Sequence, residues 1–581
     1  MIVPMKKVFM IVQKKDFVPS LEEMRALGVV HVEHNDVLKS DDITAIKDDI
    51  QLLEQVIRIL ENAKTDDHAP KEALDSVFEW REVTECVLHQ MKKIEVLSDN
   101  ILKRQGLINK LQKWGNFEPQ DISHLKEKGI NVSFCEMPVS QKIVPKEGVI
   151  VEVLSRTGGI NNCMVITTGS VDPGHEGIVL PAKSLSHEHD SQEKEKNNIK
   201  RAEDELKAQV KYLPALKRKL REKEEKLVFK EVIVGAKNTG ELTLLKGYCP
   251  QKTCSQIETK AKEHQWGILF EDPSEEDKVP TLLENPKWVS VINPLINFIG
   301  ILPGYKEVDI NPFLLLFFSL FVGILVGDAG YGFIYLLTCA IAHFAMRKKV
   351  KDITFFKLIY LLCGCIIVWG VFTGTYFGQE WLGSSVKPVI PWLVDPKNLQ
   401  TLCFLVGAIH LSIAHCWRMI LFYPSLVILS EAGWIFLVWG MYFAARMFIL
   451  DVAFPGAGII LFILGPLLVY LFSEVTPLKK YLQTVSGQLF PKTLDIIGVF
   501  SDIVSYIRLY AVGLATVAIA DAANRMSISW IIILHAINIL LAALAILVHA
   551  LRLNTLEFSR HLGLEWTGFT YDPFRKTENI N

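Results

Sequence analysis

Charged residues are scarce in one long part of this 581-residue sequence. Residues 1–310 hold 94 of the 126 Lys, Arg, Asp and Glu residues, whereas residues 311–555 hold only 25. A stretch of about 245 residues with one charge in ten, broken into apolar runs of bilayer length, is typical of a membrane domain. The scarcity excludes a purely soluble enzyme and a disordered chain, and it divides the sequence into a soluble half and a membrane half.

The soluble half lacks an excess of positive charge, and the whole chain lacks clustered cysteines. Residues 1–310 hold 44 basic and 50 acidic residues, which excludes a nucleic-acid binder of the usual basic kind. The ten Cys residues form no CxxC pair and no Cys/His cluster with metal-ligand spacing, and Cys363 and Cys365 are too close for an unstrained bridge. We therefore expect reduced thiols and no bound metal, rather than a secreted disulfide scaffold.

Signatures of catalysis and of secretion are also missing. Residues 1–310 contain no P-loop, no GxGxxG after a strand, no HExxH and no nucleophile elbow. We therefore predict no catalytic site in this chain and no cofactor. The N-terminal apolar run is too short for a signal peptide and no cleavage site follows it, so we expect the start of the chain to stay in the cytoplasm.

The soluble half contains small α/β regions separated by long helices. Apolar residues alternate spacings of three and four, the coiled-coil period, at Ile43, Ile46, Ile50, Leu53, Ile57 and Leu60. Leucines repeat at seven in a later charged helix, at Leu206, Leu213, Leu220 and Leu227. Pro214 is expected to kink that helix, and residues 65–72 interrupt the first pattern. Two interpretations are open: an intramolecular helical hairpin and an intermolecular coiled coil.

The order of these elements predicts a dumbbell-shaped α+β arm. Its near-membrane lobe combines residues 1–36 and 229–275, and its far lobe covers residues 113–190, with a turn at Gly158-Gly159. A coiled coil of residues 40–112 and 193–228 joins the two lobes. An arm with two small lobes and no catalytic constellation has a shape suited to holding partners.

The membrane half contains seven apolar runs, at about 312–346, 355–378, 400–422, 426–449, 455–473, 493–524 and 527–556. The first run holds GDAGYG (327–332) at its middle, and these Gly and Asp residues predict a turn between two short spans. Basic residues stay on the cytoplasmic side of a membrane, and a double crossing places RKKVKD (347–352) there. We therefore predict an all-α domain of eight spans within residues 311–560 and a cytoplasmic tail at 561–581. The domain is expected in the inner cell membrane, with both termini of the chain on the cytoplasmic side.

Arg508 lies deep inside one of these apolar runs. An Arg near mid-bilayer costs at least about 2.5–3.5 kcal/mol on insertion scales, so such residues usually face the bundle interior or water and serve a function. The alternative is an ion pair with a membrane acid such as Asp502 or Glu431. Asp502 lies six residues before Arg508, on a largely opposite face of an ideal helix, so it is a poor partner within that helix.

Several other polar residues lie in or beside the predicted spans. Arg552 is near the cytoplasmic end of the last run, where it either has a function or extends to the headgroups. His549 shares its face three residues earlier, and a satisfied interior histidine is the alternative. For Asp328, Glu431 and Asp502, a turn or an interfacial position explains the acid equally well. The last two runs have about 30 residues against about 20 needed to span, so we expect two long tilted helices.

At this point the sequence resembles the a (or I) subunit of the rotary V/A-type ATPases, in its prokaryotic form. The stretches that carry the resemblance are VPTLLENPKW (279–288), YKEVDINPF (305–313), GDAGYG (327–332), TGTYFG (373–378), SYIRLYAVGLA (505–515) and HALRLNTLEF (549–558). Their order after a coiled-coil half makes the resemblance specific, and it covers essentially the whole chain.

The resemblance implies a static subunit that touches a rotating ring of proteolipids, each with an ion-binding carboxylate, and that provides two aqueous half-channels. The family's essential arginine corresponds to Arg508, its second arginine to Arg552, and the Asp of its GD motif to Asp328. His549 matches a polar position three residues before the second arginine. Thr516 stands where some eukaryotic members have a His, so no His-based channel step is expected there.

The resemblance also implies half-channel roles for Glu431 and Asp502, and it implies partners. These are the rotor proteolipid ring (c/K subunits), E/G-type coiled coils of peripheral stalks bound by the soluble arm, a central-stalk subunit at the ring, and the lipid bilayer, with no nucleic acid. The ion, H⁺ or Na⁺, is not fixed by this chain. The alternative function is a secondary transporter with a cytoplasmic coiled-coil regulatory arm; it predicts inverted repeats, whereas GDAGYG has no clear counterpart in the second half of the membrane domain.

Overall fold

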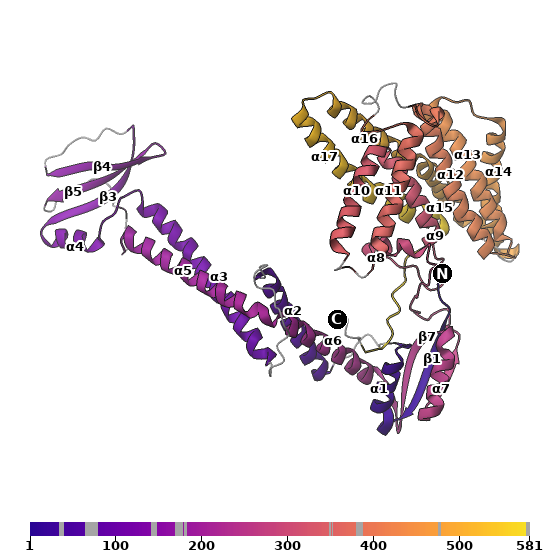
Figure 1. Ribbon diagram of the computed structural model, residues 1–581, viewed down its shortest axis with the longest axis horizontal. Coiled ribbons are helices and arrows are strands. Elements are labelled where there is room, and N and C mark those ends of the chain that lie inside the picture. Colours follow the sequence, from indigo (N-terminus) through magenta and orange to yellow (C-terminus); the bar gives the residue numbers. More distant parts are fainter. Residues whose placement is uncertain are drawn as a thin grey trace. The chain divides into compact units, whose positions relative to one another are not determined.

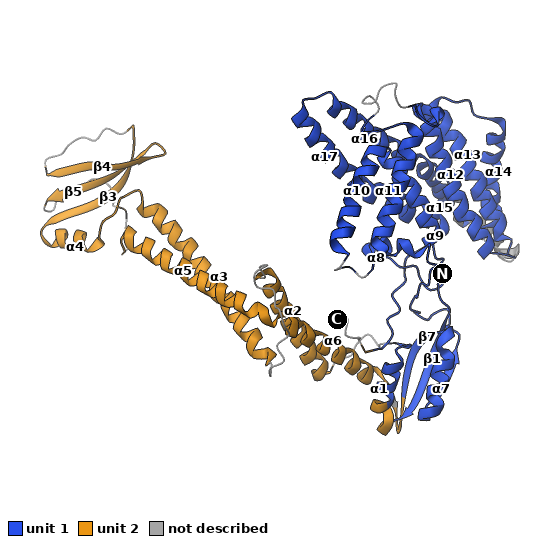
Figure 2. Cartoon of the chain, in the orientation of Figure 1, with its two compact units in different colours: residues 1–13, 20–33, 244–575 blue, residues 14–19, 34–243, 576–581 orange. Residues whose placement is uncertain are grey.

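Two compact units divide the chain (Figure 2). Unit 1 combines residues 1–13, 20–33 and 244–575, and unit 2 combines residues 14–19, 34–243 and 576–581. The computed structural model describes residues 1–33, 40–63, 79–140, 148–168, 178, 183–347, 350, 352–378, 387–473 and 478–576. Unit 1 therefore contains the membrane helices and the sheet of the near-membrane lobe, and unit 2 contains the coiled coil and the far lobe.

Two pairs of long helices form the coiled coil of unit 2 (Figure 1). Helix α2 (Asp41–Ala63) packs against α6 (Leu213–Gly235), and α3 (Trp80–Leu111) packs against α5 (Leu185–Ala208). Their apolar stripes form one buried core, which includes Leu53, Val87, Leu206 and Leu216. The heptad pattern is thus buried within one chain, in agreement with the intramolecular interpretation. The interruption predicted at 65–72 lies outside the described residues.

The later helix of this coiled coil is divided near Pro214. After α5, a 3-10 turn covers Gln209–Tyr212, and Pro214 stands in the first turn of α6, where its missing N–H is tolerated. Helix α6 then continues to Gly235, so residues 229–235 were wrongly assigned to the near-membrane lobe. The apolar, β-branched composition of this stretch is typical of strands, but buried Val232 extends the packed face of the helix.

A three-stranded antiparallel sheet forms the far lobe. Its order is β3 (Ile130–Pro138), β5 (Ile160–Thr168), β4 (Val149–Thr157). Gly158 and Gly159 join β4 to β5 with φ angles of 56° and 81°, a left-handed conformation that the predicted turn requires. The core of the sheet contains Cys135, Met137, Cys163 and Val165.

The near-membrane lobe in unit 1 is built on a second sheet. Its strands follow the path β2 (His31–Val32), β7 (Leu242–Pro250), β1 (Met5–Gln13), β8 (Gly267–Glu271). The predicted strand–helix–strand start of the chain is confirmed, with α1 (Phe17–Leu27) between β1 and β2. The remaining short elements of the described chain are η1 (Lys14–Asp16), α4 (Pro119–Glu127), β6 (Lys237–Thr239), η4 (Gln251–Thr253), α7 (Cys254–His264), η5 (Ser290–Ile292), α8 (Asn293–Ile299) and η7 (Pro391–Val394).

The C-terminal segment is not an independent tail but packs on this lobe. The amide of Phe574 donates to the carbonyl of Val30 (2.8 Å), and the amide of Tyr571 donates to the carbonyl of Thr281 (3.1 Å). The Tyr571 hydroxyl donates to the carbonyl of Val29 at 2.6 Å. We call residues 564–575 the C-terminal strap. The strap brings the end of the last membrane helix to the same lobe from which the first one departs.

The membrane helices form the rest of unit 1. They are α9 (Asn311–Val326), α10 (Ala329–Met346), α11 (Thr354–Thr373), α12 (Pro396–Leu421), α13 (Val427–Leu450), α14 (Gly456–Phe472), α15 (Leu478–Ser505), α16 (Ile507–Asn524), α17 (Ile528–Ala545), two π-helical segments η8 (Ile546–Ala550) and η9 (Leu553–Phe558), and α18 (Ser559–Leu562). Six segments among the described residues are long and apolar enough to cross a membrane: 329–346, 354–373, 396–421, 427–450, 490–524 and 528–562. The protein is therefore a multi-pass membrane protein; α9 and α14 are shorter apolar helices.

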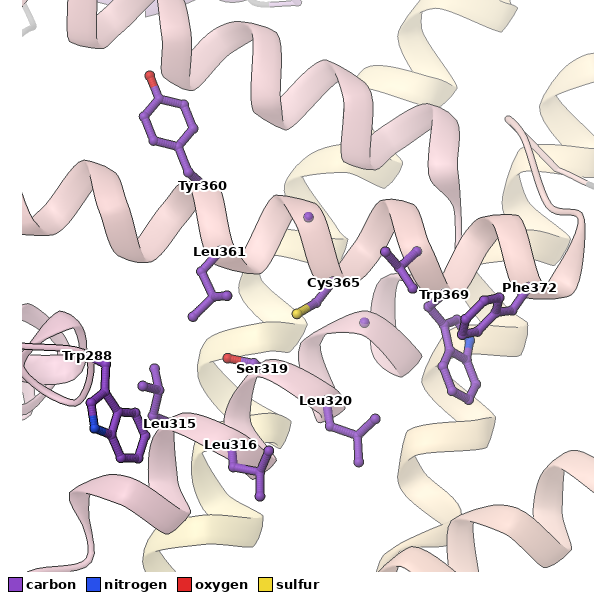
Figure 3. Close-up of a pocket in the computed structure, with 13 residues that line it drawn as sticks. Trp288, Leu315, Leu316, Ser319, Leu320, Tyr360, Leu361, Cys365, Trp369 and Phe372 are labelled. Atoms are coloured by element: carbon purple, nitrogen blue, oxygen red, sulfur yellow. The ribbon is translucent and has the colours of Figure 1, made fainter.

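The turn predicted within GDAGYG is confirmed. Helix α9 ends at Val326, Gly327 has a φ of 64°, and α10 begins at Ala329 with Asp328 as its N-cap. Helix α11 packs against both α9 and α10. Figure 3 shows the residues of α9 and α11 advancing in the same direction along an apolar cavity of about 710 Å³. Because α10 is antiparallel to α11, α9 and α10 run in opposite directions.

The antiparallel packing of α10 on α11 follows from two contacts. A Cβ at Gly332, early in α10, would lie 2.9 Å from the side chain of Ile366, late in α11. His343, late in α10, lies 3.0 Å from the hydroxyl of Tyr360, early in α11.

The last two apolar segments have the predicted great length, 35 residues each. The first is interrupted at Tyr506, between α15 and α16, and the second passes through the π-helical segments η8 and η9. Their tilt in a bilayer stays a prediction.

Candidate functional site

Arg508 lies in the first turn of α16, near the middle of the 490–524 segment. The preceding Tyr506 fixes the break between the helices, because its ring packs where Gly407 leaves no side chain and its hydroxyl lies 2.9 Å from His410 Nδ1. The Arg508 side chain is 23% exposed. Neither Asp502 nor Glu431 pairs with it, but another acid of the membrane helices, Glu557, does, so the alternative of an ion pair with a membrane acid stays open with a different partner.

The acid closest to Arg508 is Glu557, which sequence reasoning missed. Arg508 Nη1 lies 4.0 Å from Glu557 Oε1, and Arg552 Nε lies 3.6 Å from the same oxygen. The Glu557 side chain is 6% exposed. One carboxylate thus lies between the two arginines that the sequence singled out.

The π-helical segments explain this geometry. In an α-helix, residues five apart differ in direction by about 140°, so Arg552 and Glu557 would diverge. In a π-helix the backbone hydrogen bonds join residues five apart, which brings such residues to one face. His549 lies in η8, half-buried, three residues before Arg552, and its side chain makes no hydrogen bond within the described residues.

Glu431 and Asp502 belong to one hydrogen-bonded chain of four titratable side chains. Glu431 Oε2 lies 2.7 Å from His415 Nδ1, and His415 Nε2 lies 2.9 Å from His561 Nδ1. His561 Nε2 lies 3.0 Å from Asp502 Oδ2. We call these four residues the His415–His561 chain. Arg418 Nη2 pairs with the other oxygen of Glu431 at 3.1 Å, so the acid is held from two sides.

This chain borders a cavity of about 260 Å³. The further polar residues that line the cavity are Arg418, Lys492, Asp495 and Arg560. The Glu431 and His415 side chains are almost fully buried, whereas the Asp502 side chain is 15% exposed. The chain therefore runs from a buried carboxylate to one at the wall of a polar cavity.

Asp328 has a different environment. Its side chain is fully buried, and it accepts hydrogen bonds from the backbone amides of Gly330, Tyr331, Phe377 and Gly378 at 2.8–3.1 Å. These four donors tie the start of α10 to the TGTYFG loop. A carboxylate with four backbone donors is well suited to hold two segments together.

A second polar cluster lies beside this anchor. Tyr331 OH lies 2.7 Å from His535 Nδ1 and accepts from Asn538 Nδ2 at 3.0 Å. His535 Nε2 lies 3.0 Å from Asn524 Oδ1, and Asn538 Nδ2 donates to the carbonyl of Thr516. We call these residues the Tyr331–His535 cluster. Asn524 of this cluster lies sixteen residues after Arg508, which is about 24 Å along α16. Asp502 of the His415–His561 chain instead lies before Arg508, on α15.

Four of the residues singled out in the sequence fall into two groups in the structure: Arg508 and Arg552 lie beside Glu557, and Glu431 and Asp502 belong to the His415–His561 chain. Sequence reasoning missed His561, which follows the last predicted span, and did not include His415 among the candidate site residues. The sequence signal for His561 was its spacing: it lies four residues, about one helical turn, after Glu557, which belongs to the HALRLNTLEF stretch.

Comparisons with known proteins agree on one family. A family model described as V-type ATPase 116kDa subunit family matches residues 182–380. The chain is 29% identical over 624 residues to a protein named V-type ATP synthase subunit I 1 from Treponema pallidum, covering 99% of this chain and 100% of that protein. It is 28% identical over 616 residues to V-type ATP synthase subunit I from Borreliella burgdorferi, with the same coverage of both chains.

A more distant relative and one solved structure also match. An A-type ATP synthase subunit I from Pyrococcus abyssi is 27% identical over 380 residues, covering 58% of this chain and 54% of that protein. A crystal structure of the cytoplasmic N-terminal domain of subunit I, homolog of subunit a, of V-ATPase covers 46% of this chain and 100% of its own, with 13% identity and a TM-score of 0.18.

The relatives that match along their whole length are named subunit I of V-type ATP synthase, and this chain has several apolar helices long enough to cross a membrane. The family model and these two full-length relatives therefore support an assignment of this chain as a V/A-type ATPase subunit a/I, a membrane stator subunit without a catalytic site of its own.

Proposed function

We propose that this chain provides two ion half-channels and an essential arginine, Arg508, to a rotating proteolipid ring. It thereby couples translocation of H⁺ or Na⁺ to ATP hydrolysis or synthesis elsewhere in the complex. The observation that carries the proposal is the position of Arg508 along α15 and α16, with the His415–His561 chain on one side and the Tyr331–His535 cluster on the other.

The chemistry of arginine supports this role for Arg508. Its guanidinium stays protonated under all working conditions. A fixed cation opposite a rotor carboxylate favours the ionised carboxylate, which releases its bound ion. The same cation opposes direct passage of ions between the two half-channels. A carboxylate that then enters lipid must first be neutralised by a new ion.

The His415–His561 chain supports one half-channel. Three contacts link two carboxylates and two imidazoles, and each contact needs one proton. With both carboxylates ionised, three of the four ring nitrogens carry a proton, so one ring is an imidazolium. That additional proton can reside on either ring or on a carboxylate. Such a chain accepts a proton at Asp502 and delivers one at Glu431, or the reverse.

The Tyr331–His535 cluster supports the other half-channel, near the far end of α16. Its phenol, imidazole and amides offer donors and acceptors for water and ions within apolar helices. In this proposal Asp328 shapes the half-channel by anchoring the TGTYFG loop rather than by carrying the ion, because four amides already occupy its carboxylate.

We also propose eight spans, with the N-terminal half and the C-terminus in the cytoplasm. The opposed directions of α9 and α10 support a double crossing by residues 311–346. The C-terminal strap on the near-membrane lobe supports an even number of crossings, because both ends of the membrane domain then lie on one side. The basic RKKVKD loop favours the cytoplasmic side for that lobe.

The soluble arm is proposed to hold peripheral-stalk E/G-type coiled coils against torque. The coiled coil of unit 2 supports this, because ion pairs across the helices, such as Lys223–Asp49 at 2.6 Å and Arg104–Glu188 at 2.6 Å, add to its apolar core. The proposed partners at the membrane are the proteolipid ring and a central-stalk subunit at that ring.

The competing function, a secondary transporter with a regulatory arm, needs discontinuous helices in both halves of the membrane domain. The break at GDAGYG and the break at Tyr506 are not equivalent, because the first reverses the chain and the second continues α15 into α16. No specific contact in the described residues favours this alternative.

The test is Arg508→Ala in the complex reconstituted into vesicles. We expect intact assembly with ATP-driven ion transport lost by at least about 100-fold, since a buried charge partner of the ring is removed. Lys260→Ala, on the exposed face of α7, is the control. Normal transport by Arg508→Ala would refute the proposal, and a secondary transporter would move ions without any ring subunit.

A further inference from the structure

Glu557 is a buried acid without a hydrogen-bond partner for one of its oxygens. Oε2 of Glu557 and Nη1 of Arg508 are both buried, and neither has a hydrogen-bond partner within the described chain. They belong to an ion pair whose closest contact, Arg508 Nη1 to Glu557 Oε1, is 4.0 Å. That separation is longer than a hydrogen bond, so opposite charge holds the pair without a fixed bond.

The same carboxylate faces two cations at once. Because Arg508 Nη1 and Arg552 Nε lie 4.0 and 3.6 Å from one oxygen, the two nitrogens are no more than about 8 Å apart. Two guanidinium groups this close repel each other strongly in an apolar surrounding. Glu557 reduces their joint charge from two to one.

The charged and titratable neighbours of Glu557 come from several elements. Arg508 and Tyr506 lie at the start of α16, Asp502 lies on α15, and Arg552 lies on its own helix. His410 of α12 stacks on the adjacent Phe558 at 4.3 Å and lies between that ring and Phe317. The π-helical segment η9 holds Glu557 in this position, and a bulge of this type often marks a functional position.

We propose that Glu557 is a positioning residue that acts as the resident counter-ion of Arg508 and Arg552. When the partner surface presents a neutral carboxyl group, Glu557 holds both arginines at the interface. When an ionised carboxylate arrives, Arg508 turns toward it, and Glu557 continues to balance Arg552. The cost of the exchange is small because no hydrogen bond between Arg508 and Glu557 has to break. This inference rests on the proposed function, because the arriving carboxylate belongs to the ring.

The experiment uses the whole complex in vesicles, with Glu557→Gln, Glu565→Gln and Arg508→Ala compared side by side. Glu565 is an exposed acid eight residues further along the chain, so it is the matched control. ATP hydrolysis and ATP-driven uptake are measured over a range of pH with a pH-sensitive dye, and over a range of Na⁺ concentrations with radioactive Na⁺.

For Glu557→Gln we expect intact assembly and at least about tenfold slower ATP-driven transport, because the uncompensated cations hold the arriving carboxylate too tightly. The extra net charge also favours its ionised form, so the pH optimum shifts down by about one unit, or the half-saturating Na⁺ concentration rises about tenfold. Replacing a residue that only packs the helix would change neither the pH optimum nor the half-saturating Na⁺ concentration. Wild-type transport with an unmoved optimum overturns the proposal for Glu557, while Arg508→Ala separately tests the proposed function.

If Glu557→Gln prevents assembly, the double variant Glu557→Gln/Arg552→Gln decides. In the double variant Arg508 is the remaining charge of the three, so their net charge is again +1, as in the unaltered chain. Recovered assembly would therefore support the counter-ion role. Assembly that stays lost in the double variant identifies a structural role for Glu557 and overturns the proposal.

Discussion

Nε2 of His415 lies 2.9 Å from Nδ1 of His561, and the two rings meet edge to face at an interplanar angle of 85°. This contact joins α12 to α18 and closes the chain of titratable groups between Glu431 and Asp502. A direct contact between two ring nitrogens passes a proton but leaves no room for a metal cation. The proposed half-channel along this chain can therefore be tested as a path for protons.

We predict that His561→Ala slows ATP-driven proton transport by at least about tenfold, because it removes the central link of the chain. ATP hydrolysis and dye quenching in vesicles measure the effect. The exposed His124 of the far lobe, changed to Ala, is the control. Wild-type proton transport by His561→Ala would show that this chain is not an ion path.

The positions of Arg508 and of the GDAGYG turn were predictable because each depends on local chemistry. An arginine inside an apolar run and two glycines beside an aspartate are visible in the sequence. The turn lies where it was expected, and Arg508 lies near the middle of a long apolar segment, whereas its role stays a prediction. The burial of the heptad residues of α2 followed equally directly from spacing.

Glu557 and His561 were not predictable in the same way, because both depend on departures from regular structure or on distant contacts. Standard helix spacing directs Glu557 away from Arg552, and only the π-helical segment η9 brings them together. His561 is 146 residues from His415 in sequence. The composition of residues 230–235 predicted a strand, but the structure has a helix there, because packing along α6 overrides β-propensity.

We predict that Asp328→Asn mainly lowers stability. An Asn would direct its NH₂ group toward the amide of Gly378 or toward the other donors, so at least one buried N–H loses its acceptor, at a cost of about 1–3 kcal/mol. Thermal unfolding of the purified complex measures this loss. We expect transport per assembled complex to fall by less than about threefold.

Asp395→Asn is the matched control for Asp328. Asp395 is also an N-cap, of α12, but it is exposed and accepts from a single amide, that of Lys397 at 2.8 Å. Asn is an equally good cap at such a position, so we expect little change. Unchanged stability of Asp328→Asn together with lost transport would contradict the anchor role and assign the ion path to Asp328.

We predict that Phe574→Ala loosens the C-terminal strap. The Phe574 side chain is buried, its ring faces the guanidinium of Arg25, and its amide bonds to Val30 of the near-membrane lobe. Removing a buried Phe ring costs about 3–5 kcal/mol, more than a short strap is able to compensate. Limited proteolysis of the full chain should then cleave within residues 564–575, whereas Phe569→Ala, which truncates a 41% exposed side chain, should change little. Equal cleavage rates in both variants would contradict the packing described.

The ion pair between Lys7 and Asp277 gives a pH-dependent prediction for the near-membrane lobe. Lys7 Nζ lies 2.7 Å from Asp277 Oδ1, and both side chains are mostly buried. Burial alone would raise the pKa of Asp277, but hydrogen bonds from Lys7 and Ser274 outweigh it and lower the pKa from 3.8 to about 2. A carboxyl group with a lowered pKa stabilises the fold above its unfolded pKa, so this contribution of about 2 kcal/mol is complete at pH 5–8 and is lost as the pH falls from about 4 toward 2.

Asp277→Asn should therefore lower the local free energy of opening by about 2 kcal/mol at pH 7, and the difference from the unaltered chain should vanish near pH 2. Hydrogen exchange of the β1 and β8 amides in the full chain measures it. Asp272→Asn is the control, because the Asp272 side chain is 82% exposed and its pairing with Lys6 is screened by water. A difference between Asp277→Asn and the unaltered chain that persists unchanged below pH 3 would mean that packing, rather than the charge of Asp277, stabilises the lobe at this position.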